Sequence, residues 1–338
     1  MKELDLVSDH VPVLLSNFSS LLPSTLGIWV DGTFGFGGYS RWLLKSGATK
    51  VIAIDIDPDT LSPAFALEKS WPGKFKILAG NFCDMHGLVS SLGFKNVSGI
   101  VLDVGISSMH IDCPIRGFSI KNDGPLDMRM SKKGPSAKDF INGATEELIA
   151  EVLLKYGEER HAKAIAKRIV ENRQKQPINS THQLIGIIDK VLGNKSKRRI
   201  HPATRSFQAI RVAINRELEN LIGGLASAYK LLDIGGVLAV ITFHSLEDRI
   251  VKRFFNLRTE NYNSIDEIKC VGGNSEPLFT KLNKRPVTPT PQELFNNPRA
   301  RSAKLRMVKK ISQNYVNINP GLLGLPKVSP SLKEFQCD

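Results

Sequence analysis

The stretch Ile28-Trp29-Val30-Asp31-Gly32-Thr33-Phe34-Gly35-Phe36-Gly37-Gly38 joins a short apolar run, a glycine-rich turn and the first residue of a helical segment. Four apolar runs in the first third of the chain have the length of buried strands: Ile28–Asp31, Val51–Asp55, Phe75–Leu78 and Ile100–Val104. The segments Gly38–Ser46 and Pro58–Lys69 have the pattern of crossover helices. This alternation predicts an α/β protein with a doubly wound parallel sheet.

The glycine-rich turn Asp31–Gly38 allows the backbone to approach a ligand closely. It is not a dinucleotide fingerprint, because the third glycine is missing, and it lacks the Lys-Ser/Thr pair of a P-loop. Asp55 ends the second strand, 18 residues after Gly37, where a carboxylate can accept both hydroxyls of an adenosine ribose. These features favour S-adenosylmethionine (SAM) as ligand. A nicotinamide cofactor, or a structural turn beside a solvated Asp, is the alternative.

Two further residues follow strands at the same edge of the predicted sheet. Phe82 comes after the third strand and either borders an adenine or belongs to the core. Asp103 ends the fourth strand, at the edge that also carries Asp31 and Asp55. An acid at this position either faces a reacting centre or caps the following turn.

The middle of the chain interrupts the α/β pattern. Residues 116–138 predict a loop, Glu146–Gln174 predicts a helical segment with a bend at Gly157, and Ser180 is placed to cap a helix through Val191. We therefore expect a discontinuous α/β core, residues 1–115 and 204–312, around an inserted loop and all-helical domain at 116–203. Residues 313–338 form a tail.

The α/β pattern resumes in the second half of the chain. Apolar residues recur at helical spacing from Phe207 to Leu221, which predicts one amphipathic helix packed on the sheet. Gly235-Gly236 is predicted to break the chain before a strand at Val237–Phe243, and another strand is expected around Ala303–Val308.

The charge balance points to a polyanionic partner. The chain has 338 residues with 46 Lys and Arg against 33 Asp and Glu, a net charge of +13. Nucleic acid fits this charge best and an acidic membrane surface second. Two basic stretches are placed for phosphate contacts: Lys195–Arg205, and Arg299–Lys310 with Arg299, Arg301, Lys304, Arg306, Lys309 and Lys310. Without an apolar run of membrane length, an export signal or a metal-type Cys cluster, we expect a cytoplasmic protein without a metal site.

Nine blocks along the chain resemble the signature of the RsmH (MraW) family of bacterial SAM-dependent small-subunit ribosomal RNA cytosine methyltransferases. They run in order from about His10 to Lys310: Asp31–Gly38, Asp55–Asp57, Asp103–Ser108, Arg116–Ser119, Asp123–Met130, Tyr156–Arg160, Pro202–Ala209, Phe243–Arg249 and Asn297–Arg306. Several blocks are long and are not generic to Rossmann-like folds, so the resemblance is specific.

The resemblance implies a class I SAM-dependent methyltransferase fold whose helical insertion recognises the substrate. The implied reaction methylates the exocyclic 4-amino group of a cytosine in the decoding region of 16S rRNA, free or in the assembled small subunit, and not DNA or a membrane component. The family's SAM contacts map onto Gly37, Gly38, Tyr39, Asp55, Phe82, Asp103 and His110. Tyr39 stands where His is frequent, and His110 where Gln is usual.

The implied chemistry needs acceptors that localise the lone pair of a cytosine amine. The Asn/Asp-Pro-Pro-aromatic motif of many amino-methyltransferases is absent, so Asp103 is the candidate catalytic residue. Asp127, Arg129 and His244 are candidates for the cytosine pocket, with an ion pair or loop cap as the alternative. The alternative function is a non-catalytic ribosome-assembly protein that binds RNA and retains a SAM-like pocket.

Overall fold

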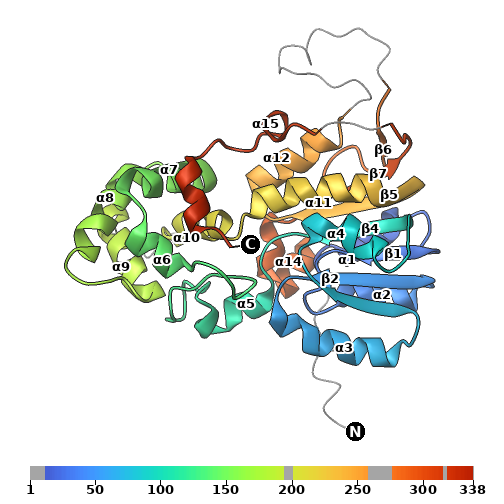
Figure 1. Cartoon of the computed structure of the whole chain (residues 1–338), viewed down its shortest axis with the longest axis horizontal. Coiled ribbons are helices and arrows are strands. Elements are labelled where there is room, and N and C mark those ends of the chain that lie inside the picture. Colours follow the sequence, from blue (N-terminus) through green and yellow to red (C-terminus); the bar gives the residue numbers. More distant parts are fainter. Residues whose placement is uncertain (1–11, 194–200, 258–275, 315–317, 338) are drawn as a thin grey trace. The chain divides into compact units, whose positions relative to one another are not determined.

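The computed structural model describes residues 12–193, 201–257, 276–314 and 318–337. The chain forms two compact units: a sheet unit, Met1–Gly105 with Glu219–Leu325, and a helical unit, Ile106–Leu218 with Pro326–Asp338 (Figure 1). The helical unit is thus longer than the expected 116–203 and includes the end of the chain. Among the described residues, no helix is both long and apolar enough to cross a membrane.

The sheet unit is built on a seven-stranded sheet in the order β3-β2-β1-β4-β5-β7-β6. Its strands are β1 (Ile28–Asp31), β2 (Lys50–Asp55), β3 (Phe75–Ala79), β4 (Val97–Asp103), β5 (Leu232–Thr242), β6 (Phe279–Lys281) and β7 (Lys304–Lys310). Strands β1 to β5 are parallel, and β7 is antiparallel to both neighbours. The strand order reverses between β1 and β4, so the predicted doubly wound α/β class is confirmed.

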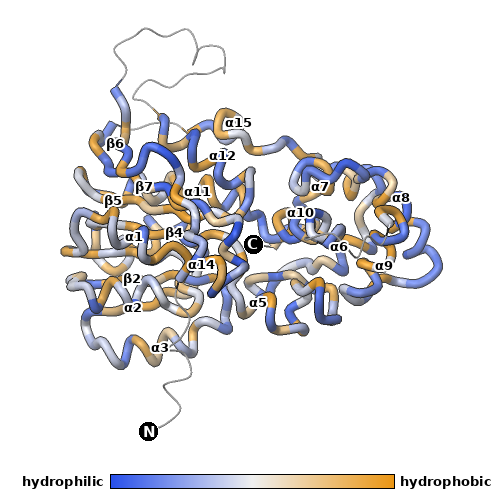
Figure 2. The backbone as a smooth tube through the Cα atoms, turned by 180° about the vertical axis from the view of Figure 1, so that it is seen from behind, coloured by the Kyte–Doolittle hydropathy of each residue, from blue (hydrophilic) through white to orange (hydrophobic). Residues whose placement is uncertain are grey.

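Helices cover both faces of the sheet (Figure 1). One face packs against α1 (Leu15–Leu21), α2 (Gly38–Lys45) and α3 (Leu61–Ser70). The other packs against α4 (Met85–Ser90), α11 (Glu217–Leu231) and α12 (Ser245–Phe254). The parts of β4 and β5 that are covered on both faces, residues 100–102 and 237–241, are continuous apolar runs, and apolar segments are orange in Figure 2.

Strand β5 differs from its prediction because it begins at Leu232 and runs through Gly235-Gly236. The prediction of a chain break at this glycine pair was wrong. The pairing of β5 with β4 shifts register between Leu232 and Val237, and Gly235 has a φ of 85°. A bulge with glycine in the left-handed region therefore absorbs the pair inside the strand.

The helical unit consists of short helices: α5 (Ser108–Asp112), α6 (Ala137–Gly143), α7 (Glu146–Gly157), α8 (Ala162–Arg173), α9 (Thr181–Leu192) and α10 (Thr204–Ile214). The predicted cap at Ser180 is confirmed, since its hydroxyl accepts the Gln183 N–H. Gly157 ends α7, and a Cβ there would lie 2.6 Å from the Arg205 carbonyl oxygen. The glycine thus permits close packing of α7 on α10.

The predicted single helix from Phe207 to Leu221 is wrong, because α10 ends at Ile214 and Arg216 has a φ of 52° before α11 begins. The Asn215 side chain explains the break. It donates to the Met128 carbonyl oxygen at 2.7 Å and accepts the Met130 N–H at 2.8 Å. Helix α10 packs on α7, within the helical unit.

The tail is divided between the two units, and its last part, Pro326–Asp338, belongs to the helical unit. The Cys337 N–H donates to the Ile214 carbonyl oxygen at 2.7 Å, and the Ser329 N–H donates to Glu151 at 3.0 Å. The Phe335 ring meets the Phe140 ring edge-on, with centroids 5.6 Å apart. The chain end therefore packs as part of this unit.

The cations of the basic stretch Arg299–Lys310 differ in burial. Arg306 and Lys304 on β7 bond the Asp248 carboxylate on α12, at 2.8 and 3.2 Å. Lys310 is buried and donates to the Tyr229 and Leu232 carbonyl oxygens, so the expectation of a phosphate contact from it is wrong. Its exposed cations are Arg299, Arg301 and Lys309. Lys195–Ile200 of the other basic stretch lie outside the described residues.

Candidate active site

Three carboxylates mark the carboxyl edge of the sheet. Asp31, Asp55 and Asp103 are the last residues of β1, β2 and β4. The strand order reverses between β1 and β4, and in open α/β sheets the ligand crevice lies at such a switch point. The sequence prediction of a common edge for these three acids is confirmed.

The glycine-rich turn connects this edge to α2. Gly35 and Gly37 have φ values of 52° and 74°, in the left-handed region that favours glycine. A Cβ on Gly38 would lie 2.2 Å from Pro12 Cγ, so no larger residue fits there without displacing the chain. The first turn of α2 begins at Gly38, and N–H groups in a first turn have no acceptor within the helix. The backbone of Gly38 and Tyr39 therefore presents donors at this edge.

Asp55 holds the turn in place. One of its oxygens accepts the Gly35 N–H at 2.7 Å, and the other accepts the Asp57 N–H at 2.9 Å. These bonds fix the carboxylate, which is half-buried at the end of β2. A carboxylate fixed in this way at a strand end is of the type that accepts hydroxyl groups from a ribose.

Asp31 is buried beneath the turn. It accepts the Ser40 hydroxyl at 2.7 Å and the Thr33 N–H at 3.2 Å. Burial raises the pKa of Asp31 from 3.8 to about 6, although both hydrogen bonds act to lower it. The Asp31 carboxyl group, beneath the glycine-rich turn, therefore gains or loses its proton near pH 6.

Asp103 is the one carboxylate of the three with an unsatisfied buried oxygen. Its N–H donates to Thr33 Oγ1 at 2.7 Å, which ties the end of β4 to the turn. Its Oδ1 is buried and has no hydrogen-bond partner among the described residues. Burial, and then the nearby charges of Asp31 and Glu247, raise the pKa of Asp103 from 3.8 to about 8. A buried acceptor without a partner is uncommon, and here it marks a position for a ligand donor.

Two of the expected cofactor contacts involve aromatic residues. The Tyr39 hydroxyl donates to the Val13 carbonyl oxygen at 2.5 Å, and its ring packs edge-on against Phe18. The Tyr39 side chain therefore belongs to the core, and only its backbone is placed for a ligand. Phe82 begins the 3₁₀ turn after β3 and is half-buried. A Cβ on Gly224 of α11 would lie 2.3 Å from its ring.

Gly224→Ala is expected to weaken SAM binding about tenfold, because the added methyl group would displace the Phe82 ring, which the sequence predicts to border an adenine. Alanine is the better helix former, so the loss would not come from α11 itself. Titration calorimetry measures the affinity. Gly186→Ala in α9, where a Cβ meets nothing within 4 Å, is the matched control. Unchanged SAM affinity in Gly224→Ala would show that the Phe82 ring does not border the cofactor.

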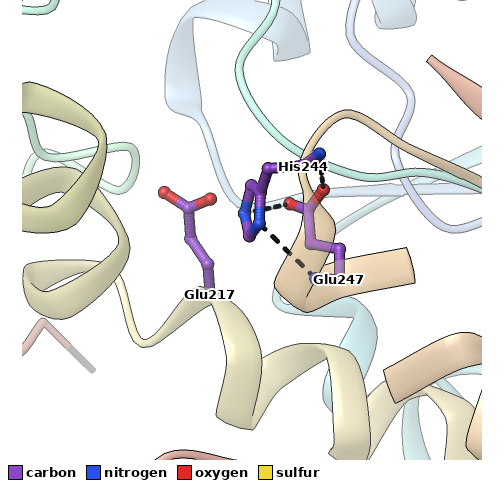
Figure 3. A group of neighbouring side chains, drawn as sticks. All are labelled: Glu217, His244 and Glu247. Atoms are coloured by element: carbon purple, nitrogen blue, oxygen red, sulfur yellow. Dashed lines mark hydrogen bonds and ion pairs between the residues drawn. The ribbon is translucent and has the colours of Figure 1, made fainter. Parts of the chain in front are cut away.

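His244 and Glu247 follow β5, the neighbour of β4 (Figure 3). Glu247 Oε2 accepts the N–H groups of Phe243 and His244 at 2.8 and 3.1 Å, and the Glu247 N–H donates to His244 Nδ1 at 3.4 Å. This reciprocal capping fixes both side chains, which are 8% and 2% exposed. Glu217, also drawn in Figure 3, belongs to the helical unit, where it bonds Arg211 at 2.7 and 2.9 Å.

The other expected site residues lie in the helical unit. His110 Nδ1 accepts the Ser107 N–H at 3.2 Å. Its ring lies against the Phe118 ring, with centroids 4.8 Å apart and planes tilted by 37°. Arg129 bonds both oxygens of Asp127, at 2.9 and 2.8 Å. The ion pair named as the alternative for Asp127 and Arg129 is therefore present. The structure places these residues in a different compact unit from Asp55 and Asp103.

Sequence reasoning assigned no role to Thr33 or Glu247. Both lie inside the family blocks Asp31–Gly38 and Phe243–Arg249. Thr33 bonds Asp103, 70 residues away, and the charge of Glu247 raises the pKa of Asp103. The only sequence signal for Glu247 was its place three residues after His244, the spacing of a capping box.

The sheet order, the glycine turn at its switch point and the acids beside it define a class I methyltransferase fold. The chain belongs to the MraW methylase family, whose model matches residues 7–311. This membership removes the basis for a nicotinamide-dependent oxidoreductase.

Curated relatives cover almost the whole chain. "Ribosomal RNA small subunit methyltransferase H" of Cereibacter sphaeroides (strain KD131) is 43% identical over 319 residues, which is 94% of this chain and 95% of that protein. The proteins of that name from Jannaschia sp. (strain CCS1) and Paramagnetospirillum magneticum are 44% and 46% identical, over 94% and 88% of this chain and 96% and 94% of theirs.

Proposed function

We propose that this protein is a SAM-dependent enzyme that methylates the exocyclic 4-amino group of a cytosine in the decoding region of 16S ribosomal RNA. The observation that carries the proposal is Asp103, whose buried Oδ1 has no partner among the described residues and lies at the switch point of a methyltransferase sheet. Membership of the MraW methylase family and the name of its relatives, ribosomal RNA small subunit methyltransferase H, support methyl transfer and the rRNA substrate.

The residues of the sheet unit fit SAM. We assign the ribose hydroxyls to Asp55, which two backbone N–H groups fix, and the adenine to Phe82, which lies against Gly224. The backbone of Gly37, Gly38 and Tyr39 is proposed to supply further contacts. When bound, SAM supplies an electrophilic methyl group. His110, in the helical unit, is proposed as a further contact on the family resemblance alone.

Asp103 is proposed to act on the target amine. The lone pair of a cytosine 4-amino group is delocalised into the ring, so a hydrogen bond from that amine to a fixed acceptor is needed to hold the nitrogen for attack. Asp103 Oδ1 offers this acceptor. Because burial raises the pKa of Asp103 to about 8, its carboxylate is also basic enough to take the proton that the amine loses.

The substrate is proposed to be small-subunit rRNA, free or in the assembled subunit, in the cytoplasm. The net charge of +13 and the exposed Arg299, Arg301 and Lys309 support contacts with phosphates. We assign substrate recognition to the helical unit. Extruding a stacked base costs a few kcal/mol, so contacts outside the reaction site must contribute to binding.

The test is transfer of a labelled methyl group from SAM to purified small ribosomal subunits, free 16S rRNA and DNA, followed by nucleoside analysis. We expect label as 4-methylated cytidine in the subunit or the rRNA and none in DNA. SAM binding without transfer to any of the three would favour the non-catalytic assembly protein. Label on another base or atom would overturn the cytosine assignment.

A further inference from the structure

His244 carries a second buried polar atom without a hydrogen bond among the described residues, and it follows the strand next to that of Asp103. Its Nδ1 accepts the Glu247 N–H, so in the neutral ring the proton sits on Nε2. Nε2 is buried and makes no hydrogen bond among the described residues. Glu247 Oε1 lies 3.0 Å away, but not in hydrogen-bonding geometry. His244 Nε2 is therefore a fixed, buried nitrogen that lies beside the Glu247 carboxylate but makes no hydrogen bond among the described residues.

The donor and the unsatisfied acceptor come from neighbouring strands. Asp103 ends β4, where it pairs with Ile241 of β5, and His244 follows the end of β5. The charge of Glu247, which is bonded to the His244 backbone, acts on Asp103. One donor and one acceptor, both buried and both without a hydrogen bond among the described residues, thus follow neighbouring strands of the sheet.

We propose that His244 determines base specificity: its Nε2–H donates to the N3 atom of the target cytosine while Asp103 Oδ1 accepts from the 4-amino group. This inference rests on the proposed function and adds the way in which the base is read. Cytosine carries an amino group, which pairs with the acceptor Asp103, beside a ring nitrogen with a lone pair, which pairs with the donor His244. Uracil carries a carbonyl oxygen and an N3–H in the same places, so it would leave both buried groups unpaired.

Glu247 has a positioning role in this arrangement. Its Oε2 accepts the two N–H groups at Phe243 and His244, which fixes the backbone before α12. Its N–H selects the tautomer in which His244 Nε2 is the donor. Glu247 itself is not proposed to touch the substrate.

The test combines a protein variant with a modified base. His244→Asn keeps an N-cap side chain for α12 but does not extend as far as Nε2. The substrate is a small subunit or rRNA with either cytidine or 3-deazacytidine, which lacks the N3 acceptor, at the target position. Single-turnover transfer is measured for all four combinations, with Ser245→Ala at the exposed first residue of α12 as the control variant.

We expect 3-deazacytidine to slow transfer by wild-type protein about tenfold to a hundredfold, and His244→Asn to slow transfer to cytidine similarly. The two changes together are expected to cost no more than either alone, since both remove one hydrogen bond. Ser245→Ala should keep the full effect of 3-deazacytidine, and His244→Asn should bind SAM normally.

Two results would contradict the inference. If the effects of His244→Asn and 3-deazacytidine multiply, the ring does not contact N3, although the proposed function stands. If wild-type protein transfers no methyl group to the cytidine substrate, the proposed function fails, and the inference fails with it.

Discussion

Asp103→Asn is expected to lower the rate of methyl transfer about 10²- to 10³-fold while it raises thermal stability. The variant keeps an acceptor oxygen of similar shape but cannot take the proton of the amine. It also removes a buried carboxylate that Asp31 and Glu247 repel. Transfer of labelled methyl groups and thermal unfolding, measured on the same preparation, check both parts. Asp59→Asn, at an exposed acid near the same edge, is the control.

The gain in stability has a defined pH dependence. The pKa of Asp103 is raised from 3.8 to about 8 in the folded protein, so the folded state binds the proton more tightly than the unfolded state. Its contribution to stability is present at low pH and is lost as the pH rises toward 8. The advantage of Asp103→Asn in the free energy of unfolding should therefore grow between pH 4 and pH 8. A constant difference would mean that Asp103 titrates normally and that its burial has no role in the reaction.

The sheet was predictable because its signals are local. The run Ile28–Asp31 matches β1 residue for residue, since an apolar strand ends at an Asp and a glycine turn. Gly235-Gly236 misled the prediction because a bulge depends on pairing with β4, which is distant in sequence. The break at Asn215 was missed for the same reason, because its cause is the bond to Met128, 87 residues away.

The candidate site was predictable as a set of positions but not as a set of roles. Asp31, Asp55 and Asp103 each end a predicted parallel strand, and this alone predicted that they lie at one edge of the sheet. The sequence could not tell that Asp31 is satisfied by Ser40 while Asp103 retains an unpaired oxygen. It also could not distinguish Tyr39, whose side chain is committed to Val13, from a ligand contact. These distinctions arise from packing between separate segments.

The affinity for SAM is expected to rise with pH, up to about a hundredfold between pH 6 and pH 8, whereas the affinity for S-adenosylhomocysteine should change much less. Burial raises the pKa of Asp31 to about 6 and that of Asp103 to about 8, so Asp103 is mainly protonated at pH 6. A cationic sulfonium favours the ionised carboxylate, and its binding must then release a proton. The demethylated product lacks that charge and gains little from ionisation.

Calorimetry at both pH values, in two buffers of different ionisation enthalpy, measures affinity and proton release together. Asp103→Asn should flatten most of the pH dependence and retain only the part that comes from Asp31 near pH 6. If the affinities for SAM and for S-adenosylhomocysteine depended equally on pH, the sulfonium charge would not change the ionisation of Asp31 and Asp103. The expected difference has a functional consequence. The positive charge of the sulfonium, which keeps Asp103 ionised, disappears when the methyl group leaves. Asp103 therefore becomes a stronger proton acceptor at the step at which the amine must lose its proton. The same loss of charge lowers the affinity for the demethylated product.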